Sequence, residues 1–175
     1  LKDYAKWQQD MLGSVKLDGQ RQFWMEQFSD DLPKIQLPSS LKRPSTKTYN
    51  GHALSMYFSK ELTSKLNAFS KEEGGSLFMT LLAGWNALLY KLTGEKDIII
   101  GSPVAGREHP DLKDQIGFYI NTLALRNYID PEKSFASFYA SLKKNTLSAL
   151  QNQMYPFDQL VEDLELDRDV SRSPL

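Results

Sequence analysis

The stretch that decides the fold is residues 97–105, which read Asp-Ile-Ile-Ile-Gly-Ser-Pro-Val-Ala. Its continuous β-branched run predicts a buried strand in a central position, with both faces covered. The preceding residues, 76–92, carry apolar side chains around much of a helical surface, and Gly94 supplies a left-handed stop. A helix this apolar needs a large partner. We therefore expect it to pack on the sheet and to bury Trp85 and Leu89.

On either side of the predicted helix 76–92 and strand 97–105, further strands and helices alternate along the sequence. Apolar residues at helical spacing predict helices over 15–31, 59–73, from 130 or 134 to 153, and from Pro156 onward. Alternation predicts strands over 52–58 and 116–129, and the proline-containing stretch 32–49 predicts an extended surface connection. Strands that alternate with covering helices indicate an α/β unit.

Composition excludes several classes of function. The chain has 175 residues, of which 21 are basic and 22 acidic, so no basic excess favours nucleic acid as a partner. It has no cysteine, which excludes disulfides, thiolate zinc sites and a cysteine nucleophile and fits a reducing compartment. No apolar stretch reaches the roughly 20 residues that cross a bilayer. We expect a cytoplasmic location and no membrane partner.

Self-contained catalytic chemistry is not evident in the sequence. The two histidines, His52 and His109, lack a second histidine at metal-binding spacing, so a surface or strand role is the better interpretation. No Gly-x-Ser-x-Gly elbow, Walker loop or dinucleotide fingerprint occurs. The acidic residues between 162 and 169 indicate a solvated helix end, because no glycine-turned loop presents their oxygens together. We expect no metal and no directly bound cofactor.

Four phrases occur in order along the chain. They are Asp3–Gln8 (DYAKWQ), Ile116–Arg126 (IGFYINTLALR), Gln153–Leu164 (QMYPFDQLVEDL) and Arg168–Leu175 (RDVSRSPL), and Ile100–Arg107 (IGSPVAGR) supports them. Together they resemble the later signature motifs of condensation domains in nonribosomal peptide synthetases, the multienzymes of antibiotic biosynthesis. The resemblance covers essentially the whole chain. One departure is Ser173, where asparagine is usual.

The resemblance implies a fold and a place in a larger domain. Residues 1–175 would form the C-terminal lobe of a two-lobed, chloramphenicol-acetyltransferase-like fold, an α/β lobe whose mixed β-sheet is covered by helices. The family's hallmark, His-His-x-x-x-Asp-Gly, is absent from this sequence, and we expect it upstream of Leu1 in an N-terminal lobe. The reacting groups would meet between the lobes. We therefore expect this chain alone to fold, to be inactive and to self-associate.

The resemblance also implies a reaction and its partners. Upstream and downstream peptidyl carrier proteins would present acyl groups as thioesters on phosphopantetheine arms, next to an adenylation domain. The acceptor's amine would attack the donor thioester carbonyl and form an amide bond, largely through positioning of the two reactants. The segment Ile116–Asn121 looks like the condensation type rather than the epimerisation type. A heterocyclisation relative and a non-catalytic docking lobe are further alternatives.

Candidate site residues follow from the phrases, and none is expected to be a catalytic base. In the family, Asn121 lies near the tunnel between the lobes, where its amide can orient the thioester carbonyl or the amine. An equal alternative is a structural amide that fixes a neighbouring loop. Residues 106–115 would form the tunnel floor. A lobe-seam or structural role is expected for Gly117, Arg126, Tyr155, Pro156, Phe157, Arg168, Asp169 and Arg172.

Overall fold

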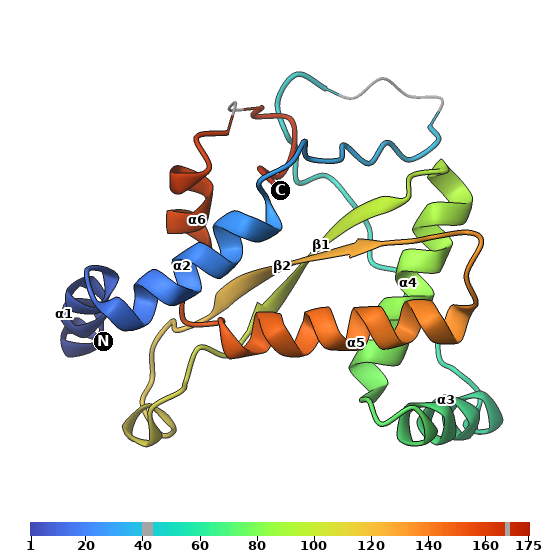
Figure 1. The fold of residues 1–175 in the computed structure, drawn as a ribbon, viewed down its shortest axis with the longest axis horizontal. Coiled ribbons are helices and arrows are strands. Elements are labelled where there is room, and N and C mark those ends of the chain that lie inside the picture. The colour runs from blue at the N-terminus through green and yellow to red at the C-terminus, as the bar shows by residue number, and fades with distance from the viewer. Residues whose placement is uncertain (40–43, 167–168) are drawn as a thin grey trace.

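The structure, a computed structural model, describes residues 1–39, 44–166 and 169–175 (Figure 1). In chain order its elements are α1 (Lys2–Leu12), α2 (Val15–Gln27), α3 (Lys60–Glu72), α4 (Leu77–Thr93), β1 (Asp97–Val104), the short 3₁₀ helix η1 (Pro110–Leu112), β2 (Asn121–Tyr128), α5 (Phe135–Gln151) and α6 (Phe157–Asp163). The hydroxyls of Ser59, Ser76 and Ser134 cap α3, α4 and α5 by accepting a backbone N–H. Gly94 ends α4 with a φ of 73°, as predicted.

The two strands pair antiparallel, in a register that runs from Asp97 opposite Tyr128 to Val104 opposite Asn121. Helix α5 packs along β2, and α4 packs against α5 and β1 (Figure 1). Helices α2 and α6 contact each other, and α6 also contacts β2. The predicted α/β class is confirmed. Among the described residues the sheet is this antiparallel pair, so the expected mixed sheet is not formed there.

The core lies between the strands and the helices that cover them. Side chains at most 2% exposed come from the strands and from three helices, and they include Leu17 of α2, Ala83 of α4, Ile98, Leu123, Tyr139 and Leu142. Trp24 of α2 is 3% exposed, and its indole N–H donates to the carbonyl of Asn152 at 2.9 Å. Burial of a large apolar side chain stabilises a fold by about 1.5–3 kcal/mol. Trp24 therefore anchors α2 to the end of α5.

The strand predicted over residues 52–58 is wrong. Leu54 is 94% exposed and Met56 is 84% exposed, and the segment is extended without a strand partner among the described residues. Alternating apolar residues form a stable strand only where a neighbouring strand offers hydrogen bonds and a surface to cover. No such surface lies next to this segment in the described part of the chain.

The expected burial of α4 and β1 is only partly correct. Leu89 is 9% exposed, whereas Trp85 is 55% exposed, because α4 presents one side to α5 and β1 and leaves the other to solvent. In β1, Ile98 is fully buried, but Gly101 and Pro103 are exposed, so both faces are not covered. None of the described helices, α4 included, is both long and apolar enough to span a bilayer.

Strand β2 begins at Asn121, five residues later than predicted. Ile116 is 100% exposed and Phe118 is 76% exposed. The carbonyls of Gln115 and Gly117 accept hydrogen bonds from a side chain, at 2.9 and 3.2 Å. Both bonds come from Arg107, and within the described ranges residues 116–120 are not paired with a strand. The segment from 116 to 120 therefore runs beside the sheet rather than within it.

Candidate functional site

A cleft of about 380 Å³ lies among α1, the loop after β1 and the turn between α5 and α6. Aromatic and amide side chains line much of it, including Tyr4, Trp7, Tyr119, Asn121, Gln153 and Phe157. The loop contributes Gly106, Glu108, His109 and Leu112. Three of the four sequence phrases, together with the supporting phrase that ends at residue 107, therefore meet around one cavity.

Asn121 stands at the first position of β2 and holds the turn between α5 and α6. Its Nδ2 donates to the carbonyls of Gln153 and Tyr155, each at 2.8 Å, and its Oδ1 accepts from the backbone N–H of Phe157 at 3.0 Å. All three bonds go to main-chain groups that the α5–α6 turn leaves without helical partners. The amide thus fixes one wall of the cleft, and it does so through the backbone.

A second amide holds the same turn from the other side. The Oε1 of Gln20, on α2, accepts from the backbone N–H groups of Met154 and Tyr155, both at 3.1 Å. Pro156 follows with a φ of −66° and stands at the N-cap of α6, where its missing N–H is no loss. Gln20 was not anticipated from the sequence, because the N–H groups that donate to it lie more than 130 positions away.

Tyr155 belongs to a polar cluster behind this turn. The Tyr155 ring is buried and its hydroxyl donates to Asp163, which also accepts from Arg21 Nε at 2.6 Å and from Gln159 Nε2 at 3.1 Å. Burial, followed by the hydrogen bond to Asp163, raises the pKa of Tyr155. Burial alone would raise the pKa of Asp163, but the hydrogen bonds from Tyr155, Gln159 and Arg21 outweigh it and lower that pKa.

Acidification is expected to remove the stability that Asp163 contributes. The folded-state pKa lies below the ordinary value of 3.8, so the unfolded chain binds the proton more tightly. The contribution is therefore present above that value and is lost as pH falls through the folded-state pKa. The Asp163→Asn variant should be less stable than the wild type by about 1 kcal/mol at pH 7, and the difference should shrink at pH 3.

Urea unfolding at both pH values, followed by circular dichroism, measures this difference. The control is Asp114→Asn, a change at an exposed loop carboxylate, which should follow the wild type at both pH values. If Asp163→Asn were destabilised relative to the wild type as much at pH 3 as at pH 7, the ionised carboxylate of Asp163 would not be the source of this stability.

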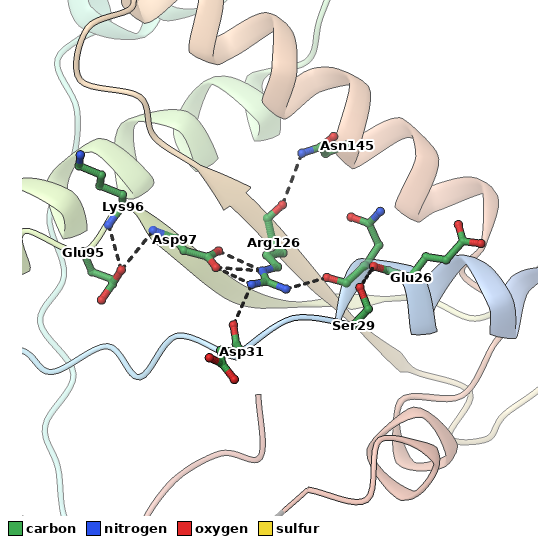
Figure 2. A network of polar contacts seen from close by, with 9 residues as sticks. Glu26, Ser29, Asp31, Glu95, Lys96, Asp97, Arg126 and Asn145 are labelled. Carbon is green, nitrogen blue, oxygen red and sulfur yellow. Dashed lines mark hydrogen bonds and ion pairs between the residues drawn. The ribbon is translucent and has the colours of Figure 1, made fainter.

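Arg126 lies away from the cleft and ties the sheet to the segment that follows α2. Its guanidinium bonds both carboxylate oxygens of Asp97, the shortest contact being 2.6 Å, and donates to the carbonyls of Gln27 and Asp31 at 2.9 and 3.0 Å (Figure 2). Hydrogen bonding to Asp97 raises the pKa of Arg126. The side chains of Arg126 and Asp97 are 15% and 22% exposed, so this is a largely buried, bidentate pair.

The C-terminal phrase forms a local turn, and its described residues do not line the cleft. Asp169 Oδ1 accepts from the backbone N–H and the hydroxyl of Ser171, at 2.9 and 2.6 Å, and Oδ2 lies 3.4 Å from Arg172 Nε. The hydrogen bonds from Ser171 lower the pKa of Asp169. Arg168, predicted to act with these two residues, lies outside the described residues.

Two glycines allow the loop after β1 to approach Tyr119. Gly106 has a φ of +64°, and a Cβ built there would lie 1.8 Å from the Tyr119 carbonyl oxygen. At Gly117, a Cβ would lie 2.8 Å from the Tyr119 ring. Both positions therefore require glycine for closeness, and Gly106 also for its left-handed backbone.

Aromatic rings and hydrogen-bonded backbone form much of the cleft wall. Burial, then the nearby Tyr119, raises the pKa of Tyr4, so its hydroxyl stays protonated at neutral pH. The Asn121 amide is occupied by backbone groups. Within the described ranges, no group of three or more His, Cys, Asp or Glu side chains is arranged to hold a metal. The walls offer aromatic faces and fixed backbone instead.

Comparisons with known proteins cover nearly the entire chain. Bacitracin synthase 1 from Bacillus licheniformis is 42% identical and tyrocidine synthase 3 from Brevibacillus parabrevis is 43% identical, each over 174 residues. These matches span 99% of this chain but only 3% of either relative. Bacitracin synthase 2 from Bacillus licheniformis is 41% identical over 174 residues, which make up 99% of this chain and 7% of that relative.

Solved structures have the same fold. A holo four-domain nonribosomal peptide synthetase bound to AMP and glycine superposes with a TM-score of 0.85 and 28% identity, over 94% of this chain and 13% of that one. The X-domain from teicoplanin biosynthesis superposes with a TM-score of 0.90 at 22% identity, over 98% and 39% of the two chains. The family model described as condensation domain matches residues 1–175. The chain therefore belongs to the condensation domain family.

Proposed function

We propose that this chain is the C-terminal lobe of a condensation domain that joins carrier-tethered aminoacyl or peptidyl thioesters in nonribosomal peptide biosynthesis. The observation that carries the proposal is the family match along all 175 residues. The cleft supports it, because residues of three of the four phrases and of the supporting phrase 100–107 converge there. The partial coverage of the solved structures is consistent with one lobe of a larger domain.

The reaction is an acyl transfer from sulfur to nitrogen. The acceptor's amine attacks the carbonyl carbon of the donor thioester, a C–N bond forms and the C–S bond breaks. The amine's proton goes to the departing thiolate, so the products are an amide and a free carrier thiol. This chain supplies one wall of the site and positions the reactants. The group that passes this proton from the amine to the thiolate is expected in the N-terminal lobe, on the His-His-x-x-x-Asp-Gly motif.

The partners follow from this chemistry. Two peptidyl carrier proteins, one upstream and one downstream, would each deliver a phosphopantetheine arm, and an adenylation domain would lie adjacent in a cytoplasmic assembly. Slender, partly apolar arms suit a cleft with aromatic walls. Asn121 would act on these arms by fixing the wall that they pass, since its own amide is bonded to residues 153–157.

Reconstitution tests the proposal. Donor and acceptor carriers are loaded with aminoacyl thioesters, and dipeptidyl carrier is measured by intact-protein mass spectrometry. The complete domain that contains this chain should form dipeptide, and the 175-residue chain alone should stay at the rate without enzyme. Dipeptide formed by the chain alone would show that the other lobe is dispensable.

A docking lobe without catalysis is the second candidate. It is favoured by the apolar residues left exposed along α4, which include Leu81, Trp85, Leu88 and Leu92. Exposed apolar surface of this kind marks a contact with another protein surface. A complete domain that binds both carriers yet forms no dipeptide would favour this candidate over the first.

A further inference from the structure

The side chain of Arg107 lies inside the loop that forms one side of the cleft. One terminal nitrogen donates to the carbonyls of Leu112 and Gln115, the latter at 2.9 Å, and the other donates to the carbonyl of Gly117 at 3.2 Å. A guanidinium presents its donors in a rigid planar fork, so a single arginine can bond carbonyls from several positions. Arg107 thereby joins three carbonyls of residues 112–117, and the Leu112 carbonyl also accepts from the backbone N–H of Gln115.

Arg107 also begins a column of side chains that contact one another through aromatic rings. Its guanidinium carbon lies 4.3 Å from the centroid of the Tyr119 ring, a cation–π distance. Tyr119 is 4% exposed and meets Tyr4 edge-on with ring centroids 4.8 Å apart, and Tyr4 meets Trp7 at 5.6 Å. This Arg107 column, made of Arg107, Tyr119, Tyr4 and Trp7, links the loop after β1 to α1. These elements form two sides of the cleft.

The loop has little room to take another shape. The Tyr119 hydroxyl donates to Gln115 Oε1 at 3.0 Å, which ties the column back to the loop. Gly106 and Gly117 touch Tyr119 so closely that no Cβ fits at either position. A guanidinium with three carbonyl acceptors and a ring beneath it is therefore the element that holds this closely packed loop together.

The geometry points to Arg107 as a positioning residue for amide-bond formation, one that sets the shape of loop 106–117 and hence the width of the cleft. This inference rests on the proposed function. Arg107 does not line the cleft itself, so it acts through Tyr119 and the loop carbonyls. Lysine keeps the positive charge at this position but loses the planar fork and most of the stacking. The Arg107→Lys variant therefore separates charge from positioning.

The test uses the complete domain that contains this chain, as wild type, Arg107→Lys and Arg107→Met. Two quantities are measured: amide hydrogen exchange across residues 108–117, and kcat and KM for dipeptide formation. Both variants should exchange about 10-fold faster in the loop, because its carbonyl bonds are lost. Turnover should fall about 10- to 100-fold through misplaced reactants, with KM for the carriers changed less than about 3-fold.

Two further variants make the result specific. Tyr119→Phe keeps the ring and loses only the bond to Gln115, so its effects should be in the same direction and smaller. Arg21→Lys is the matched control, an arginine on α2 that pairs with Asp163 and is about half exposed. It should leave loop exchange unchanged. Thermal melting of each variant identifies any loss that comes from global unfolding.

Each outcome decides the proposal. Unchanged exchange in Arg107→Lys shows that Arg107 does not hold the loop, and fast exchange with wild-type turnover shows that the loop's shape does not matter; either result overturns it. Reduced turnover without faster exchange also overturns it, since Arg107 would then act directly. A wild-type domain that forms no dipeptide refutes the proposed function instead, while the exchange measurement still decides the role of Arg107 in the loop.

Discussion

Replacing Asn121 by alanine is expected to lower the free energy of unfolding by about 2–4 kcal/mol, because it leaves three main-chain groups without their partners. These groups are the carbonyls of Gln153 and Tyr155 and the N–H of Phe157, all within 3.0 Å of the amide. Part of the cost is recovered where water reaches this partly buried site, which sets the lower figure.

Urea denaturation monitored by circular dichroism gives the change in stability. Asn145→Ala is a matched control, because Asn145 makes a single contact of 3.5 Å, to the carbonyl of Arg126, and stands in a helix that alanine favours. Asn145→Ala should lower the free energy of unfolding by less than about 0.5 kcal/mol. If Asn121→Ala were as harmless as this control, the amide would not be holding the turn, and a direct contact with substrate would become the better explanation.

The same variant carries a prediction for activity. In the complete domain, Asn121→Ala should reduce dipeptide turnover by more than its unfolded fraction accounts for, since the turn that it holds lines the cleft. Turnover at a temperature well below the melting transition separates the two effects. A loss of activity that merely tracks the unfolded fraction would assign Asn121 to folding alone.

Breaking the pair between Arg126 and Asp97 should lower the free energy of unfolding at least as much as Asn121→Ala does. Arg126→Met removes the five hydrogen bonds of the guanidinium. It leaves the Asp97 side chain, which is 22% exposed in the structure, without its partner. Loss of one member of a fully buried pair costs about 3–5 kcal/mol, and the residual exposure lowers the expected loss to about 2–4 kcal/mol.

A double-mutant cycle isolates the interaction. Asp97→Asn, Arg126→Met and the double variant are unfolded in urea, and a coupling energy of about 1–3 kcal/mol is expected between residues in such direct contact. Arg172→Met is the comparison, because its ion pair with Asp169 spans 3.4 Å near the surface and should be worth less than about 1 kcal/mol. Additive losses at positions 97 and 126 would show that the pair does not contribute as a unit.

Local signals in the sequence predicted α2 to α6 well, whereas α1 (Lys2–Leu12) was not predicted. The serine caps at 59, 76 and 134 and the glycine at 94 act through neighbouring backbone, so their effect is encoded within a few residues. The strand over 52–58 and the early start of β2 failed for the opposite reason. Both depended on which surface or side chain lies alongside the segment, and pattern alone does not contain that information.

The candidate site was predictable only to the level of its phrases. The phrases that contain Asn121, Tyr155 and Phe157 do converge on one cleft. The sequence did not indicate Gln20 or Arg107. Gln20 accepts from main-chain N–H groups and Arg107 donates to main-chain carbonyls, and almost any residue type could supply those groups. The roles of Gln20 and Arg107 become visible only when their main-chain partners are located in space.

The union of α2 with the far end of the chain has a consequence for synthesis on the ribosome. Four hydrogen bonds join α2 to the α5–α6 region across 128, 134, 135 and 142 positions. At roughly 5–20 residues per second, the nascent helix waits about 6–25 s before its partners are made. During that interval Trp24 and Phe28, 3% and 4% exposed in the folded chain, have nowhere to be buried. The emerging polypeptide therefore exposes the aromatic side chains of Trp24 and Phe28 to solvent and chaperones, and α2 is packed only after α6 has been synthesised.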